Sequence, residues 1–258
     1  MADEVPAYDV VVVGGGVAGL SAGVFTARAD LDTLVLNHGV SILQRNAHLE
    51  NYLGFPLGVD SRLFGLLAEE QAEEAGCELR EEKVTSVVRA DDVPADDADD
   101  GGFRVETEAG ESFAARRVVA ASWKDADYLA ELGVERVEDG SKQYVTVDEA
   151  GRTNVEGLYA AGRLAEQYHQ AIVAAGHGAQ VGITLVGDAD PEFYHDWVVP
   201  EGYFTRRDRD VPKGCEEISE DERKRRAERS HARLAEYLDE WDDRTPVPHP
   251  SFRDDVSE

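Results

Sequence analysis

The stretch YDVVVVGGGVAGL, residues 8–20, places four consecutive valines directly before a glycine cluster. The cluster has the spacing G-x-G-x-x-G at Gly14, Gly16 and Gly19. A continuous run of β-branched residues is typical of a strand that is buried on both faces. The pattern therefore predicts a buried strand that ends in a glycine-rich turn.

The residues after the glycines determine whether this motif indicates a nucleotide-binding site. Residues 20–29 are rich in alanine and favour a helix, and residues 31–36 (LDTLVL) favour a second strand. The predicted β-α-β unit, about 30 residues long, is the context in which this spacing indicates a dinucleotide site. Gly14 would permit the tight turn, Gly16 would let a pyrophosphate approach the backbone, and Gly19 would let the helix pack on the strand. A glycine turn without a ligand is the alternative.

The end of the second predicted strand is the expected place for a carboxylate that binds ribose hydroxyls. The sequence has Asn37 there, followed by His38. An amide also forms hydrogen bonds to a ribose.

The middle of the chain predicts a helix over residues 61–75, which Gly76 ends, and then a three-stranded meander. Its strands are expected at residues 83–89, 103–107 and 112–121. Further strands at 145–147 and 157–160 precede a long helix of small residues over 167–186. This helix contains GHGAQVG, which fails as a second nucleotide loop because its third glycine is one position late. It instead indicates close helix packing.

The last 68 residues differ in character from the rest. Residues 191–214 are aromatic and irregular, and Ser219 to Glu222 form a capping box for a helix over about 219–242. Apolar side chains then recur at spacings of four and three, which gives one stripe along the helix. The stripe consists of Ala227, His231, Leu234, Leu238 and Trp241. We expect it to dock on its own domain or on a second subunit.

Charge is the unusual feature of the composition. The chain has 54 acidic and 26 basic residues, a net charge of −28, and few lysines. Such a surface repels nucleic acid and anionic membranes, so neither is expected as a partner. The pattern fits a cytoplasmic protein of an extreme halophile, and an acidic mesophile protein is the alternative. No apolar run is long enough to span a membrane, and the first residues lack a basic signal-peptide start.

The two cysteines, Cys77 and Cys215, are far apart in the sequence. There is no C-x-x-C, so no local redox dithiol, and no metal site is expected.

Three blocks of sequence, taken together, resemble the thioredoxin reductase branch of the two-dinucleotide-domain flavoproteins. They are residues 8–36, the sequence ENYLGFP at 50–56, and residues 153–182, which include TNVEGLYAAGR and YHQAIVAAGHGAQVG. The resemblance implies FAD as the cofactor. It also implies an α/β, Rossmann-like three-layer FAD-binding fold with a β-meander over residues 1–190, to which residues 191–258 add a C-terminal helical tail.

The resemblance and the glycine loop together imply a set of FAD-binding residues. The set is Gly14, Gly16, Val17, Ala18, Gly19, Asn37, His38, Asn51, Val84, Ala121, Gly162, Arg163, His169, Gln170 and Ala171.

The chain departs from the family at three places. The family's nicotinamide domain, which carries the redox C-x-x-C, would lie near residues 123–143, where only about 20 residues are present, too few for a Rossmann unit. The family's ribityl-binding aspartate is Arg163, which cannot accept a hydrogen bond but can pair with a phosphate. The A-T-G motif of the family reads Ala121-Ser122-Trp123.

The sequence thus predicts an FAD-dependent oxidoreductase that takes electrons from a donor other than NADPH bound in its own second domain. The donor or acceptor would be a small molecule or a protein such as ferredoxin, and a homodimer is one arrangement open to the chain. Tyr52, Tyr168 and His169 are the candidates for proton delivery, with packing as the alternative for each. A second hypothesis is a non-catalytic FAD-binding subunit or degenerate reductase. An NAD(P)-binding protein without flavin would leave the blocks at residues 50–56 and 153–182 unexplained.

The net charge leads to a prediction about salt. Self-repulsion among 28 excess negative charges opposes the compact state, and salt of molar strength screens it by reducing the Debye length to about 3 Å. We expect the melting temperature to rise between about 0.2 and 3 M KCl, over which screening strengthens. We also expect the form without FAD to need more salt than the form with it. Thermal melts of both forms test this, and a melting temperature that ignores salt would contradict it.

Overall fold

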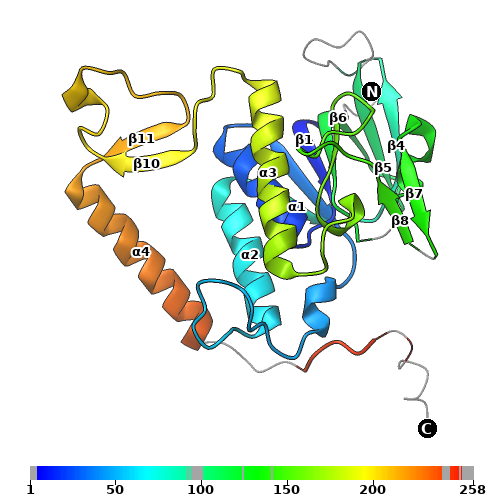
Figure 1. The fold of residues 1–258 in the computed structure, drawn as a ribbon, viewed down its shortest axis with the longest axis horizontal. Coiled ribbons are helices and arrows are strands. Elements are labelled where there is room, and N and C mark those ends of the chain that lie inside the picture. The colour runs from blue at the N-terminus through cyan, green and yellow to red at the C-terminus, as the bar shows by residue number, and fades with distance from the viewer. Residues whose placement is uncertain are drawn as a thin grey trace.

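The computed structural model describes residues 5–91, 93, 101–123, 125–140, 142–239, 245–249 and 251. Its fold is α/β and Rossmann-like, with a mixed seven-stranded sheet and a C-terminal helix. In Figure 1, the helices α1 (Val17–Arg28), α2 (Ser61–Ala75) and α3 (Ala171–Ala189) lie on one side of the sheet. The meander lies on the other side.

The parallel part of the sheet is built around β1 (Ala7–Val13). This strand pairs with β2 (Thr33–Asn37) on one side and with β6 (Ser112–Ala120) on the other. At the outer edges, β3 (Glu78–Glu81) pairs with β2, and β9 (Leu158–Ala160) pairs with β6. The predicted β-α-β unit is therefore present as β1, α1 and β2.

The predicted meander is also present. It consists of β4 (Val84–Ala90), β5 (Gly102–Thr107) and the first half of β6, all antiparallel. From Ala114 onward, β6 also pairs in parallel with β1, and from Val118 onward with β9. One strand thus belongs to both parts of the sheet and connects them covalently.

β1 separates two hydrophobic cores, because its side chains alternate between the two faces of the sheet. Val11 and Val13 contact the core that contains Phe103 and Leu129, on the meander side. Val10 and Val12 contact the other core, which lies under α1 and α3. All four valines are buried, as the β-branched run predicts.

The helices α1 and α3 pack at backbone distance. A Cβ atom added to Gly178 would lie 2.0 Å from the Ala18 carbonyl oxygen, and one added to Gly182 would lie 2.8 Å from the Ala22 carbonyl oxygen. Residues 18 and 22 of α1 therefore lie against residues 178 and 182 of α3, so the two helices run parallel. This is the close packing that the GHGAQVG sequence predicts.

The helix α2 has the bounds that the sequence predicts. The Asp60 carboxylate accepts hydrogen bonds from the backbone N–H groups of Arg62 and Leu63 at the N-terminus. Gly76 ends the helix in the left-handed conformation, with φ = 108°. A positive φ at this position is the usual reason for a glycine.

Between β6 and β9, the described chain forms the 3₁₀ helix η2 (Asp127–Leu132) and two antiparallel strands. These are β7 (Arg136–Asp139) and β8 (Lys142–Val145). The strand expected at 145–147 thus lies earlier in the sequence, at β8.

The C-terminal part projects from the rest of the molecule (Figure 1). The irregular segment contains β10 (Trp197–Pro200), which pairs in parallel with β11 (Cys215–Ile218), and the 3₁₀ helix η4 (Thr205–Arg207). The helix α4 (Glu220–Asp239) follows, and the Ser219 Oγ accepts a hydrogen bond from the Glu222 N–H at its start. The residues expected to continue the helix to 242 lie outside the described part of the chain.

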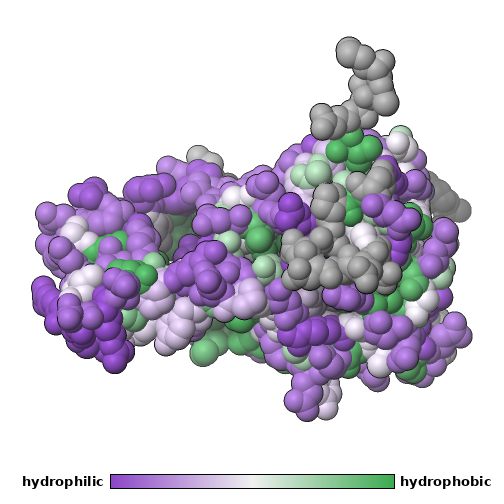
Figure 2. All heavy atoms as spheres, turned by 90° about the horizontal axis from the view of Figure 1, so that it is seen from above, coloured by the Kyte–Doolittle hydropathy of each residue, from purple (hydrophilic) through white to green (hydrophobic). Residues whose placement is uncertain are grey.

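The surface over this projecting part is mainly hydrophilic, with scattered hydrophobic patches (Figure 2). Among the described residues, no helix has the length and apolar character needed to span a membrane.

The contact between α1 and α3 yields a matched pair of substitutions on α3. Gly178→Ala places a methyl group inside a backbone contact, so we expect it to lower the free energy of unfolding by about 1–3 kcal/mol. Gly176→Ala adds the same methyl group where no atom lies within 4 Å, and should raise stability by about 0.5–1 kcal/mol. Chemical denaturation of both variants measures the difference, and equal effects would contradict the packing described.

Candidate functional site

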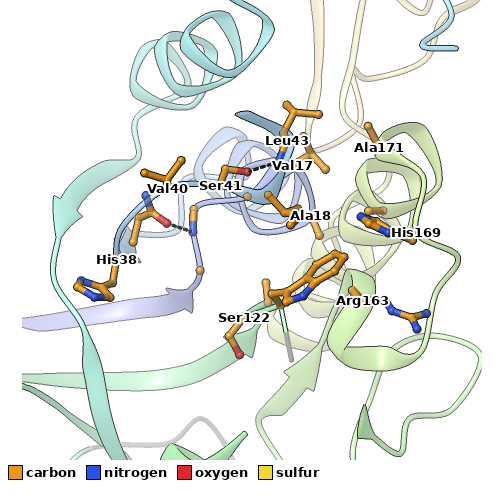
Figure 3. Close-up of a pocket in the computed structure, with 18 of the residues that line it drawn as sticks. Val17, Ala18, His38, Val40, Ser41, Leu43, Ser122, Arg163, His169 and Ala171 are labelled. Atoms are coloured by element: carbon orange, nitrogen blue, oxygen red, sulfur yellow. Dashed lines mark hydrogen bonds between the residues drawn. The ribbon is translucent and has the colours of Figure 1, made fainter. Parts of the chain in front are cut away.

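The described residues enclose a cavity with a volume of about 930 Å³. It lies where β1, β2 and β6 end, beside the N-termini of α1 and α3, and Figure 3 shows the residues around it. The carboxyl edge of a parallel sheet is where α/β proteins of this kind bind ligands.

The glycine loop forms the wall of the cavity next to α1. Gly14 has φ = 117°, and a Cβ there would lie 2.7 Å from the backbone of Ala121, so no other residue fits. Gly16 has no atom within 4 Å of its missing Cβ and borders the cavity. A ligand can therefore approach the backbone at Gly16.

The first turn of α1 provides positive potential at this wall. Gly16 is the N-cap residue, it makes no side-chain cap, and the first turn has no acidic residue. The N–H groups of the first turn and the positive end of the helix dipole therefore face the cavity with no acidic side chain beside them. This arrangement suits an anion such as a pyrophosphate.

Asn37 holds the glycine loop to the end of β2. Its Oδ1 accepts a hydrogen bond of 3.1 Å from the Gly15 N–H, while its Nδ2 lies 3.5 Å from the Gly39 carbonyl oxygen. The residue expected to bind a ribose thus also orders the loop, and one lone pair of Oδ1 is already used. His38 follows it in the cavity lining (Figure 3).

The N-terminus of α3 forms the opposite wall. Gln170 is the N-cap residue without a side-chain cap to its own helix, and the first turn has no acidic residue. Its Oε1 instead accepts a hydrogen bond of 2.7 Å from the Asn51 Nδ2. This bond joins the ENYLGFP segment to α3, so two of the sequence blocks that carry the resemblance meet here.

Trp123 and His169 form an edge-to-face pair at the same wall, with ring centroids 4.4 Å apart. Burial, together with the positive charges of Arg163 and Lys142, lowers the pKa of His169 below its ordinary value. His169 is therefore neutral at pH 7, with one ring nitrogen able to donate a hydrogen bond and the other able to accept one.

Arg163 is held by the protein itself. It follows Gly162 in the 3₁₀ helix η3 (Gly162–Ala165). Its Nη1 donates to the Gln167 carbonyl oxygen at 2.8 Å, its Nη2 donates to the Tyr144 hydroxyl, and the guanidinium lies 4.9 Å from the centre of the Tyr144 ring. The guanidinium points away from Val17 and Ala18 in Figure 3, toward β8 and not toward the first turn of α1.

Most of the residues implied by the sequence border this one cavity. They are Gly14, Gly16, Val17, Ala18, Asn37, His38, Asn51, Val84, Ala121, Arg163, Tyr168, His169, Gln170 and Ala171. Their individual roles in binding stay predictions.

Three of the implied residues do not line the cavity. Gly19 lies inside α1, where a Cβ would lie 1.8 Å from the Gly14 carbonyl oxygen. Gly162, with φ = 66°, lies against Ala18. Tyr52 packs with Phe55 and Phe64, and burial raises its pKa. These three residues lie outside the cavity lining and support the residues that form it.

Sequence reasoning missed several cavity residues, among them Ser41 and Leu43, which come from a short 3₁₀ turn η1 (Ile42–Arg45). It also assigned no site role to Ser122, whose Oγ donates to the Asp125 carbonyl oxygen at 2.6 Å and lies 2.9 Å from the Tyr128 hydroxyl. The A-S-W triplet, where the family has A-T-G, is the signal that could have identified Ser122 and Trp123 as wall residues.

Comparison with known proteins agrees with this geometry. Residues 57–178 match the family model described as pyridine nucleotide-disulphide oxidoreductase, and residues 9–44 match the one described as FAD binding domain. Part of the chain is also similar to thioredoxin reductases. Thioredoxin reductase of Listeria monocytogenes is 31% identical over 152 residues, which cover 57% of this chain and 43% of the relative. That of Treponema pallidum is 37% identical over 89 residues, or 33% and 29% of the two chains.

The chain thus spans less than half the length of the curated relatives it matches. Solved structures share the fold at lower identity. A thioredoxin reductase from Gloeobacter violaceus has a TM-score of 0.59 at 18% identity, over 73% of this chain and 97% of its own. The Lactococcus lactis thioredoxin reductase has a TM-score of 0.59 at 16% identity, over 70% and 99%.

His177 of α3 offers a pH test of how the site is supported. Its Nδ1 accepts a hydrogen bond of 3.1 Å from the Gly162 N–H, and burial lowers its pKa below the ordinary value of 6.5. As the pH falls through 6.5, the unfolded chain takes up this proton before the folded chain does. The free energy of unfolding therefore falls with pH until the lowered pKa is passed.

His177→Asn removes the titration and keeps an oxygen acceptor. We expect the wild type to lose more stability than this variant between pH 7 and pH 5, and the two profiles to run parallel above pH 7. Denaturation at a series of pH values measures this. Profiles that stay parallel throughout would contradict the assigned role of His177.

Proposed function

We propose that the chain is an FAD-dependent oxidoreductase that resembles the FAD half of thioredoxin reductase. The observation that carries the proposal is the cavity of about 930 Å³ that borders the N-termini of two helices, α1 and α3, neither capped by a side chain. FAD has an anionic pyrophosphate and a ring system whose reduced form carries negative charge. The positive N-terminal ends of α1 and α3 are therefore complementary to these two parts of the cofactor. When bound, FAD supplies the redox chemistry.

The residues of the chain would bind and orient this cofactor. The N–H groups at the start of α1, beside Gly16, would bind the pyrophosphate, and Asn37 and His38 would lie at the adenosine end. The start of α3, with Gln170 and Ala171, would stabilise negative charge at the other end. Neutral His169, fixed against Trp123, would exchange a hydrogen bond or a proton there.

The electron donor in this proposal is not NADPH bound in a second domain of the chain. The proposal is supported by the connection after β6, where the described residues form only η2, β7 and β8 before the chain returns to β9. A nucleotide-binding half needs several parallel strands and helices. A small diffusible molecule or a partner protein would then deliver or accept the electrons, and Tyr168, which is 81% exposed at the cavity, would be accessible to it.

A second candidate is a non-catalytic FAD-binding subunit or degenerate reductase that acts through a partner protein. The observation in its favour is Arg163, whose guanidinium is directed to Tyr144 and to the Gln167 carbonyl oxygen where the family has a ribityl-binding carboxylate. Photoreduction of the bound flavin separates the two candidates. Rapid reoxidation by one class among a set of added oxidants supports the enzyme, and a flavin inert to all of them supports the subunit.

The acidic composition supports a further part of the proposal, a cytoplasmic setting of high salt.

The cofactor itself gives the direct test. We expect the purified protein to be yellow and to release FAD and not FMN, because FMN lacks the pyrophosphate that the α1 N-terminus fits. Chromatography of the released flavin identifies it. Only FMN, or no flavin after reconstitution, would contradict the proposal.

Gly16→Leu tests the pyrophosphate site without straining the chain. Gly16 has φ = −80° and ψ = 179°, which any residue adopts, and its side chain would enter the open cavity. We expect folding to persist and the Kd for FAD to rise at least about tenfold, a loss of about 1.4 kcal/mol. Gly187→Leu, at an exposed position of α3 with no atom within 4 Å, is the control and should bind FAD normally. Equal flavin content in the two variants would exclude this site.

A further inference from the structure

The helix α4 contacts the rest of the molecule along one face. The Arg233 guanidinium and the Tyr237 hydroxyl both donate hydrogen bonds to the Glu70 carboxylate of α2. Nearer the N-terminus of the helix, Arg226 donates two hydrogen bonds to Glu216 of β11. The face of α4 that contacts the rest of the molecule, here called the docked face, therefore contains Arg226, Arg233 and Tyr237.

The apolar stripe of α4 lies on a different face. Ala227, His231, Leu234 and Leu238 are all exposed, and Leu234 and Leu238 retain 47% and 62% of their accessible surface. At about 100° per residue, these four positions lie roughly a quarter-turn around the helix from the docked face. We call these four residues the seam.

No other described part of the chain covers the seam. The residues described after α4 lead toward η1, where the Val247 N–H donates to the Gln44 carbonyl oxygen. The seam therefore presents apolar surface that the described fold does not use.

The spacing of the seam indicates what kind of surface fits it. The intervals of four, three and four residues are those of the a and d positions of a heptad repeat. Side chains at such positions pack into the gaps of a facing helix, not onto a flat sheet or a loop. In the sequence, Trp241 continues the same spacing, although it lies outside the described residues.

Charge along α4 indicates which helix that is. Residues 220–229 contain five basic and four acidic residues, a net charge of +1. Residues 230–239 contain one basic and two acidic residues, a net charge of −1, and the next four residues, EWDD, add three more acids. A helix with one positive and one negative half is complementary to an antiparallel copy of itself, and the opposed helix dipoles favour the same orientation.

We propose that α4 pairs antiparallel with the α4 of a second copy of the chain, through the seam, about a two-fold axis. The axis passes between His231 and Leu234, so that each His231 faces Leu234 of the other copy and each Ala227 faces Leu238. Such an interface uses the same residues from both copies, as two-fold symmetry requires. The projection of α4 from the rest of the molecule leaves it accessible to a partner (Figure 1).

The first experiment measures the mass of the full chain in solution by light scattering in high salt. We expect twice the monomer mass of 28.2 kDa for the wild type and the monomer mass for a double variant, Leu234→Asp with Leu238→Asp. Ala232→Asp places a charge on an exposed position on the opposite side of α4 and should remain a dimer. Circular dichroism checks that each variant is folded. A monomeric wild type, or a dimeric double variant, overturns the proposal.

The second experiment tests the orientation and does not depend on the folding of the charged variants. Two variants that each carry one exposed cysteine, Ala227→Cys and Leu238→Cys, are prepared with Cys215→Ser, while the buried Cys77 is kept. Oxidation of their mixture should yield the mixed disulfide between the two variants and little of either symmetric product. Symmetric disulfides alone would indicate parallel helices, and no disulfide would indicate a different interface, so either result contradicts the pairing. A monomer that binds an unrelated acidic protein through α4 would contradict it as well.

Discussion

The contact between α1 and α3 is the constraint on which the candidate site depends. Because Gly178 and Gly182 have no side chains, the backbones of the two helices meet at Ala18 and Ala22. The helices therefore run parallel and close together, and their N-termini open toward the same end of the sheet. A larger residue at either glycine would separate the helices and, with them, the two positive ends that border the cavity.

This arrangement resolves an apparent conflict between composition and ligand. A chain with a net charge of −28 is a poor receptor for an anionic cofactor if side chains provide the attraction. In the proposed complex the attraction would come from the N–H groups and helix dipoles at the N-termini of α1 and α3, which do not titrate. Arg163, the cation that the sequence suggested as a phosphate partner, instead packs on Tyr144 and donates a hydrogen bond to the Gln167 carbonyl oxygen before α3.

The sequence predicted those parts of the fold that carry a local signal. The four valines and the glycine spacing identify β1 and α1, the alternation of residues identifies the meander, and Gly76 identifies the end of α2. It did not predict β3, β7 or the parallel pairing of β10 with β11, because these strands are only four residues long and β3 and β7 are largely charged. Their pairing depends on partners elsewhere in the chain.

The residues of the candidate site were likewise predictable only where a local motif identifies them. The glycine loop and the residues of the three sequence blocks were located in advance, since a motif fixes its own geometry. The pairs Trp123–His169 and Tyr144–Arg163 join residues that are 46 and 19 positions apart, which no spacing rule predicts. Asn37 was expected at the cavity, but its hydrogen bond to Gly15 depends on how β2 and the loop meet in space.

The double pairing of β6 has a consequence for how the protein folds. Its pairing with β5 joins neighbouring segments of the chain, whereas its pairings with β1, about 100 residues earlier in the sequence, and with β9, about 40 residues later, join distant ones. Contacts between distant residues form slowly, because a long loop must be closed before they contribute. The meander is therefore able to form early, while α3, which follows β9, joins α1 only after the parallel strands are in order. We therefore expect the cavity between the two helix ends to form after the sheet.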